Sequence, residues 1–227
     1  MKTTTKTTNT RRQFLGALAM GATASTLSVL TNPIYANFPI DDVEKMNNAD
    51  TWFDKIKGKH RIVYDGSKPH NGFPVIWNWA YYLTNNGTGT PDEDMTGVTV
   101  LRHDAIPLAL NDALWAKYPL GETFKISMTD GSPYTRNPYY DPQPGDMPMP
   151  QIEGIKRMQE RGAMFCVCDL AIKVYSGAIA AQKQMDAKVV YDDWIAAILP
   201  DIQLVPSGVW ALGRAQEHGC GYIFAGE

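Results

Sequence analysis

Short apolar runs alternate along this chain with longer segments whose apolar residues recur at helical spacing. The runs are rich in β-branched and aromatic residues, and Gly, Pro or Asp residues end most of them, as is typical of buried strands. They predict five strands, over residues 60–66, 97–104, 163–169, 202–208 and 220–226. The intervening pattern predicts helices over residues 75–87, 105–118, 151–162, 170–185, 189–200 and 209–219.

Repeated strand-then-helix units of this kind predict an α/β fold, with a mainly parallel five-stranded sheet and helices on both faces. Right-handed connections then bring the carboxyl ends of the strands to one edge of the sheet, where open α/β sheets bind ligands. The residues expected at this edge are Asp65 and His70, His103 and Asp104, Cys168 and Asp169, and Ser207.

The first residues have the character of an export signal. Residues 10–16 read TRRQFLG, and a modest apolar run follows that Gly, Thr and Ser interrupt. Paired arginines before such a run are typical of a twin-arginine signal, and the alternative is a short buried helix or a membrane anchor. We expect residues 1–36 to be this signal, the mature chain to begin near Asn37, and the protein to be periplasmic. No other segment is apolar enough to cross a membrane.

After the signal, residues 37–58 predict a helical extension and residues 59–227 one α/β domain. Within this domain, residues 129–150 hold six prolines and two glycines, which excludes regular structure and predicts a long loop that acts as a lid or a contact. Nucleic-acid-binding proteins usually have a strongly basic surface, whereas this chain has a formal charge of −3, so we expect no nucleic acid as a partner.

Three cysteines leave at least one thiol outside any internal disulfide, and two of them are the neighbours Cys166 and Cys168. A bridge between residues i and i+2 of one strand would be strained, and Cys220 opens its strand whereas Cys168 closes one. A metal site would need further ligands, such as His70 and His103, and the CVC spacing is not that of a zinc knuckle. We therefore predict no metal and no cofactor.

The positions of Cys166 and Cys168 predict different roles for the two cysteines. Cys168 lies where a strand meets a helix, and amides at a helix N-terminus stabilise a thiolate, so we expect a lowered pKa and a reactive thiol. The alternative, that it is a small packed residue, stays open, and packing is the favoured interpretation for Cys166. Ser207 and Gly208 form another strand-to-helix turn, which either binds an anion or caps the helix.

The stretches CVCDLAIKVYSG and LVPSGVWALGRAQEHGCGYIF resemble the DsrE/DsrF-like family, whose small three-layer α/β proteins are of flavodoxin or Rossmann type. The resemblance runs from about His60 to Phe224 and implies a cysteine that carries sulfane sulfur, which by position is Cys168, with His103 beside it. It also implies assembly into trimers or hexamers and a sulfur donor or redox partner protein.

Two function classes remain open. In the first, Cys168 and His103 are catalytic residues of a sulfur-relay carrier or sulfurtransferase. In the second, the chain is a non-catalytic periplasmic protein that binds a small ligand, a metal or a redox partner at the same edge. His70, Ser207 and Gly208 are the candidate binding residues.

Overall fold

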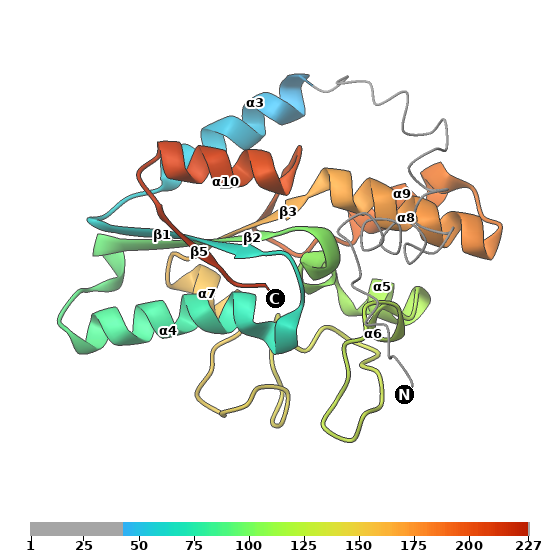
Figure 1. Ribbon diagram of the computed structural model, residues 1–227, viewed down its shortest axis with the longest axis horizontal. Coiled ribbons are helices and arrows are strands. Elements are labelled where there is room, and N and C mark those ends of the chain that lie inside the picture. The colour runs from blue at the N-terminus through green and yellow to red at the C-terminus, as the bar shows by residue number, and fades with distance from the viewer. Residues whose placement is uncertain (1–42, 227) are drawn as a thin grey trace, which may run out of the picture. The chain divides into compact units, whose positions relative to one another are not determined.

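A computed structural model describes residues 43–226 of the chain, which form one unit (Figure 1). The expected export signal lies outside the described residues. The strands are β1 (His60–Gly66), β2 (Met95–Leu101), β3 (Met164–Cys168), β4 (Ile202–Val205) and β5 (Gly221–Phe224). The helices of more than one turn are α3 (Val43–Trp52), α4 (Phe73–Gly87), α5 (Asp112–Lys117), α7 (Ile155–Glu160), α8 (Asp169–Lys183), α9 (Ala187–Ala196) and α10 (Gly208–Glu217).

All five strands are parallel and lie in the order β4-β3-β2-β1-β5, which confirms the predicted sheet. Side chains of α4, α7, α8 and α9 belong to a core on one face of the sheet, and those of α3 and α10 to a smaller core on the other. Helices therefore cover both faces, as the alternating pattern predicted.

One predicted helix is wrong. The segment expected to be a single helix over residues 105–118 divides into a 3-10 helix, η4 (His103–Ala109), and the short helix α5. Asn111 caps α5, because its side-chain oxygen accepts a hydrogen bond from the Leu114 amide at 3.0 Å. The preceding strand also ends earlier than predicted, at Leu101, since His103 has a positive φ of 49° that extended backbone does not allow.

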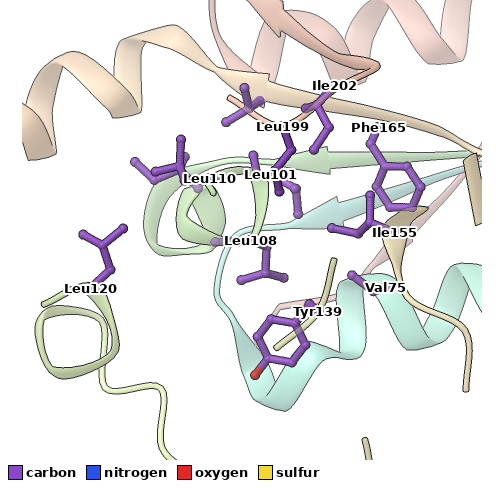
Figure 2. Close-up of a cluster of buried hydrophobic side chains, with 14 of the residues drawn as sticks. Val75, Leu101, Leu108, Leu110, Leu120, Tyr139, Ile155, Phe165, Leu199 and Ile202 are labelled. Carbon is purple, nitrogen blue, oxygen red and sulfur yellow. The ribbon is translucent and has the colours of Figure 1, made fainter. Parts of the chain in front are cut away.

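The segment 129–150 contains no helix or strand, as its prolines predicted, and it is nevertheless tied to the core. Asn137 is buried, and its amide nitrogen donates to the carbonyl oxygens of Leu108 at 2.8 Å and Leu110 at 2.9 Å. Tyr139 is buried in the larger core, where Figure 2 draws it together with Val75 and Leu108. Its ring lies so close to Gly72 that an added Cβ there would come within 2.5 Å of it.

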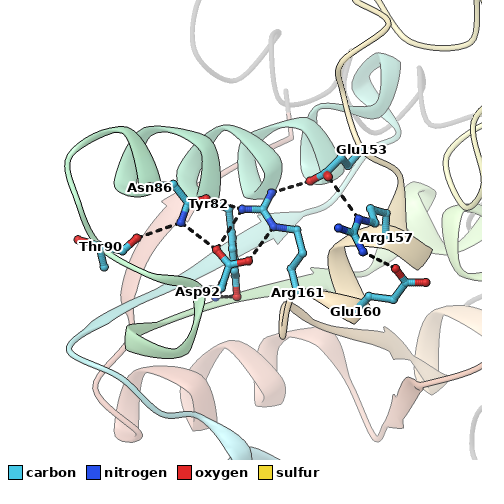
Figure 3. Close-up of polar contacts among 9 residues, drawn as sticks. Tyr82, Asn86, Thr90, Asp92, Glu153, Arg157, Glu160 and Arg161 are labelled. Carbon is cyan, nitrogen blue, oxygen red and sulfur yellow. Dashed lines mark hydrogen bonds and ion pairs between the residues drawn. The ribbon is translucent and has the colours of Figure 1, made fainter.

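An arginine cluster holds the opposite, amino-terminal edge of the sheet together (Figure 3). Arg161 donates to Asp92 at 2.9 Å, to Glu153 at 2.5 Å and to Asn86 at 2.6 Å. These contacts join the end of α7 to α4 and to the short 3-10 helix η3 (Asp92–Asp94) that precedes β2. The hydrogen bond from Arg161 lowers the pKa of Asp92, so this carboxylate stays charged at lower pH than a free aspartate would.

Candidate functional site

Because the sheet is parallel, segments from four strands meet at its carboxyl edge. His70 follows β1 in the 3-10 helix η2 (His70–Gly72), His103 follows β2, Cys168 ends β3 and Ser207 follows β4. The structure places all four sequence-predicted residues at one edge, as parallel pairing requires. It divides them, however, between two different parts of that edge.

The first part is a cavity of about 340 Å³ beside the ends of β1 and β2. Its lining comes from the segment after β1, from Asp104, from the turn after the short helix α6 (Leu120–Thr123) and from the Pro-rich loop. The lining residues are Lys68, Pro69, His70, Asn71, Asp104, Phe124, Lys125, Ile126 and Tyr139. Of the sequence-predicted binding residues, His70 alone lines this cavity.

Strained backbone is concentrated around the cavity. Three of its lining residues, His70, Asn71 and Lys125, have φ values of 40°, 52° and 55°. His103, which precedes the lining residue Asp104, has a φ of 49°. Non-glycine residues adopt this left-handed region at a cost of about 1–2 kcal/mol each, and such residues gather at functional sites. Only two other non-glycine residues in the described part of the chain share it, Gln184 and Asp201.

Asp104 carries a small polar cluster at the rim of the cavity. The Tyr175 hydroxyl donates a short hydrogen bond to its carboxylate, and His103 Nδ1 lies 3.2 Å from the same oxygen. The rings of His103 and Tyr175 meet edge to face, with centroids 5.9 Å apart. Burial raises the pKa of Tyr175, and the bond to Asp104 adds to the shift, so this hydroxyl keeps its proton and acts as a donor.

The second part of the edge surrounds Cys168, which is only 5% exposed. Its Sγ accepts a hydrogen bond from the Ala171 amide at 3.3 Å, and the amides of Gly208 and Leu170 also favour its thiolate. Cys168 thus occupies the predicted helix N-terminus. The predicted lowering of its pKa is wrong, because burial raises the pKa of this thiol by more than the amides lower it.

The other two cysteines are also free and buried. Burial raises the pKa of Cys166 well above its usual range and that of Cys220 to about 11. Among the contacts of the described residues none joins His103 to Cys168, since His103 is directed at Asp104 and Tyr175. The predicted pairing of a thiol with His103 therefore has no direct contact to support it.

Ser207 and Gly208 have structural roles at the start of α10. The Ser207 hydroxyl accepts a hydrogen bond from the Trp210 amide at 3.2 Å, which is the capping alternative. A Cβ added to Gly208 would lie 2.4 Å from Cβ of Arg102, so a glycine is needed there for close packing. Neither residue lines the cavity.

An ion pair between a half-buried arginine and a buried carboxylate joins the two parts of the edge. Arg102 donates from Nε to Asp65 Oδ1 at 2.6 Å and from Nη2 to Oδ2 at 2.9 Å, and the Tyr222 hydroxyl donates to Oδ2 at 2.8 Å. Asp65 is 3% exposed. Sequence reasoning placed Asp65 at this edge but missed Arg102 and Tyr222. Opposite charges at the ends of consecutive apolar strands were the available signal for Arg102.

Sequence reasoning also missed Lys68, Asn71 and Lys125 in the cavity. Their only sequence signal is that loops after parallel strands form ligand sites, which does not single out particular residues. Within residues 43–226, no group of three or more His, Cys, Asp or Glu side chains is placed to hold a metal ion. No helix in this part of the chain is both long and apolar enough to span a membrane.

Comparison with protein-family models, with curated proteins and with solved structures finds no match to this chain.

Proposed function

We propose that this protein binds a small acidic molecule in the cavity at the carboxyl edge of its sheet. The observation that carries the proposal is the gathering of left-handed, strained residues around that cavity, three of them in its lining. Strain of this kind opposes folding, so it persists where a ligand site needs a particular backbone shape. The cavity volume lies at the lower end of the range for small-molecule sites.

The charges in the lining support the class of ligand. Lys68 and Lys125, whose side chains end in ammonium groups, and Asn71, whose side chain ends in an amide, are among the lining residues. The one carboxylate in the lining, Asp104, already accepts the Tyr175 hydroxyl. Carboxylate, phosphate and sulfur oxyanions match two ammonium groups, and a hydroxyl or amine on the same ligand would suit Asp104.

Titration of the full chain with thiosulfate, phosphate and malonate, followed by calorimetry and thermal unfolding, tests this proposal. We expect at least one of these anions to bind and to raise the unfolding midpoint. The key variant is Lys125→Gly, which removes an ammonium group and relieves a left-handed residue. It should gain up to about 1 kcal/mol of stability and lose at least about tenfold in anion affinity.

Gln184→Gly is the matched control. Gln184 is left-handed at the end of α8 and is not part of the cavity lining, so its replacement should give the same gain in stability with unchanged anion affinity. Equal anion affinity in the Lys125→Gly variant and the parent chain would contradict the proposal. So would the failure of all three anions to bind.

The second candidate is sulfur handling at Cys168, with a sulfur donor or redox partner protein. It is supported by the amides of Leu170, Ala171 and Gly208, which favour negative charge on Sγ, and by the resemblance to sulfur-relay proteins. A persulfide on Cys168 would extend this group, and the same amides would stabilise its anion. Burial of the thiol opposes the candidate, which is why it comes second.

Thiol labelling of the folded, reduced protein with iodoacetamide tests this candidate. We expect Cys168 to be labelled before Cys220 and Cys166, since three amides favour its thiolate. Because its pKa is raised, the labelling rate should still be climbing between about pH 8 and 9. Mass spectrometry of the labelled peptides gives the order. Cys220 reacting first, or a Cys168 that stays unlabelled even at pH 9, would count against thiol chemistry at Cys168.

The location and assembly of the protein are proposals of the same kind. The paired arginines of residues 10–16 support export, which would place the cavity in the periplasm. Cell fractionation of the expressed chain checks this location. Self-association as a trimer or hexamer follows from the resemblance to the DsrE/DsrF-like family.

A further inference from the structure

The last strand, β5, forms an exposed apolar edge of the sheet. It pairs with β1 on one side only, and all four of its residues, Gly221–Phe224, are exposed. Its three large side chains, Tyr222, Ile223 and Phe224, are 42 to 49% exposed. The opposite edge strand, β4, is buried or half-buried at every position. Figure 1 shows β5 running between α10 and α4.

Apart from its short length of four residues, the edge lacks the devices that normally prevent strand pairing. Edge strands are usually protected by Lys, Pro or a bulge. The sequence of β5 is Gly-Tyr-Ile-Phe, which contains no charge and no proline, and its pairing with β1 is regular over all four residues. A bare edge of this kind is a template for a further strand.

The backbone of β5 determines which residues face outward. The Ala225 amide donates to the Asp65 carbonyl of β1 at 3.0 Å, so the backbone N–H and C=O groups of Ala225 point toward β1. The direction of these backbone groups alternates from one residue to the next along a strand. Those of Ile223 therefore also point toward β1, whereas those of Tyr222 and Phe224 point away from the sheet. These two residues can therefore form backbone hydrogen bonds with another strand.

This pattern is complementary to itself. If two copies of β5 meet antiparallel about a two-fold axis at Ile223, Tyr222 of each copy faces Phe224 of the other as a hydrogen-bonded pair. Both residues of each pair lie on the same face, because residues i and i+2 share a face of a strand. The arrangement also yields two aromatic cross-strand pairs, which stabilise sheets.

Apolar area beside the strand adds to this surface. Tyr64, the ladder partner of Ile223, meets Tyr81 of α4 edge to face, with ring centroids 6.5 Å apart. Trp77 lies one helical turn before Tyr81 on the same face and is exposed. A half-exposed aromatic side chain offers ~100 Å² and isoleucine somewhat less, so the three β5 side chains and Trp77 offer at most roughly 400 Å² per chain. Two copies would bury at most roughly 800 Å² before backbone atoms are counted, close to the ~1,000 Å² that a specific interface needs.

We propose that β5 is a homodimer interface, in which a second copy of this chain continues the sheet by antiparallel β5–β5 pairing centred on Ile223. The inference does not depend on the ligand of the cavity. The two-fold contact is compatible with a hexamer built from three dimers and incompatible with a trimer as the whole assembly.

Light scattering of the full chain between about 5 and 200 µM, the range in which an interface of this size dissociates, tests the proposal. We expect a dimer or a larger even-numbered assembly. The Ile223→Lys substitution should lower the affinity of its two-fold contact at least tenfold. Val189→Lys is the control, because Val189 is an exposed apolar residue on α9, in the connection that leads to the opposite edge strand, and its replacement should leave the mass unchanged.

Cross-linking provides a second measurement that does not require a charged residue in the strand. In the proposed register the two copies of residue 223 form a non-hydrogen-bonded pair with Cα atoms ~4.5 Å apart, within disulfide range. Ile223→Cys should therefore form a covalent dimer on mild oxidation, whereas Val189→Cys and the parent chain, whose three cysteines are buried, should not. Four results would each overturn the proposal. They are a monomer at every concentration, a trimer, an assembly that Ile223→Lys leaves unaffected, and the absence of the 223–223 cross-link. Coverage of the edge by residues 1–42 would appear as a monomer.

Discussion

Replacing Arg102 with methionine should destabilise the protein by about 3–5 kcal/mol, the largest effect we expect from a single substitution. Both guanidinium hydrogen bonds go to Asp65, which is buried, and in the variant that carboxylate would keep only the Tyr222 hydroxyl as a side-chain partner. An unpaired carboxylate away from water is unfavourable because little solvent remains to stabilise its charge. Equilibrium unfolding in urea measures the loss.

Two further variants isolate the buried charge as the cause. Arg157→Met removes an arginine that is paired with Glu160 at 2.6 Å but whose side chain is 61% exposed, so it should leave stability nearly unchanged. Adding Asp65→Asn to Arg102→Met removes the orphaned charge and should recover part of the loss. If Arg102→Met and Arg157→Met gave equal changes, the ion pair of the sheet edge would be no stronger than a surface pair.

Two glycines of the same helix should respond to alanine with opposite signs. Gly208→Ala should destabilise the protein by about 1–3 kcal/mol, because the new methyl group would lie 2.4 Å from Arg102 Cβ and 2.7 Å from its Cδ. Arg102 cannot move aside without stretching its hydrogen bonds to Asp65. Gly213→Ala meets no atom within 4 Å and should stabilise the helix by about 0.5–1 kcal/mol.

Thermal or urea unfolding of the two alanine variants side by side provides the comparison. Helix propensity contributes favourably to both substitutions, so the difference between them measures the clash with Arg102 alone. A stabilising Gly208→Ala would mean that α10 and the end of β2 can separate without loss. The amide of Gly208 would then be free to move relative to Cys168, whose thiolate it favours.

The amino-acid pattern alone was sufficient for the strands and most of the helices. The first strand has the predicted bounds, His60–Gly66, because a β-branched run ended by Asp-Gly signals both the strand and its end. The parallel arrangement followed from alternation with helices. The break at Asn111 was missed, since apolar spacing continues across it and the cap competes with that pattern only locally.

The sequence also determined which residues gather at the carboxyl edge, since parallel strands allow no other arrangement. It could not determine their neighbours within that edge. His103 and Cys168 each follow or end a strand there, yet the left-handed backbone at His103 directs the ring to Asp104 and Tyr175, while Cys168 lies under the starts of α8 and α10. A single local motif carries no information about such contacts between distant segments.

Burial decided the remaining questions, and burial is a property of the assembled fold. The helix N-terminus at Cys168 is local and was predicted, whereas the desolvation that reverses its effect on the pKa comes from packing around the end of the sheet. The same holds for β5, whose sequence is that of an interior strand. β5 lies beside β1 and at the edge because the strand order is β4-β3-β2-β1-β5. Only the tertiary structure determines this order, since the connection from β4 to β5 crosses the whole width of the sheet.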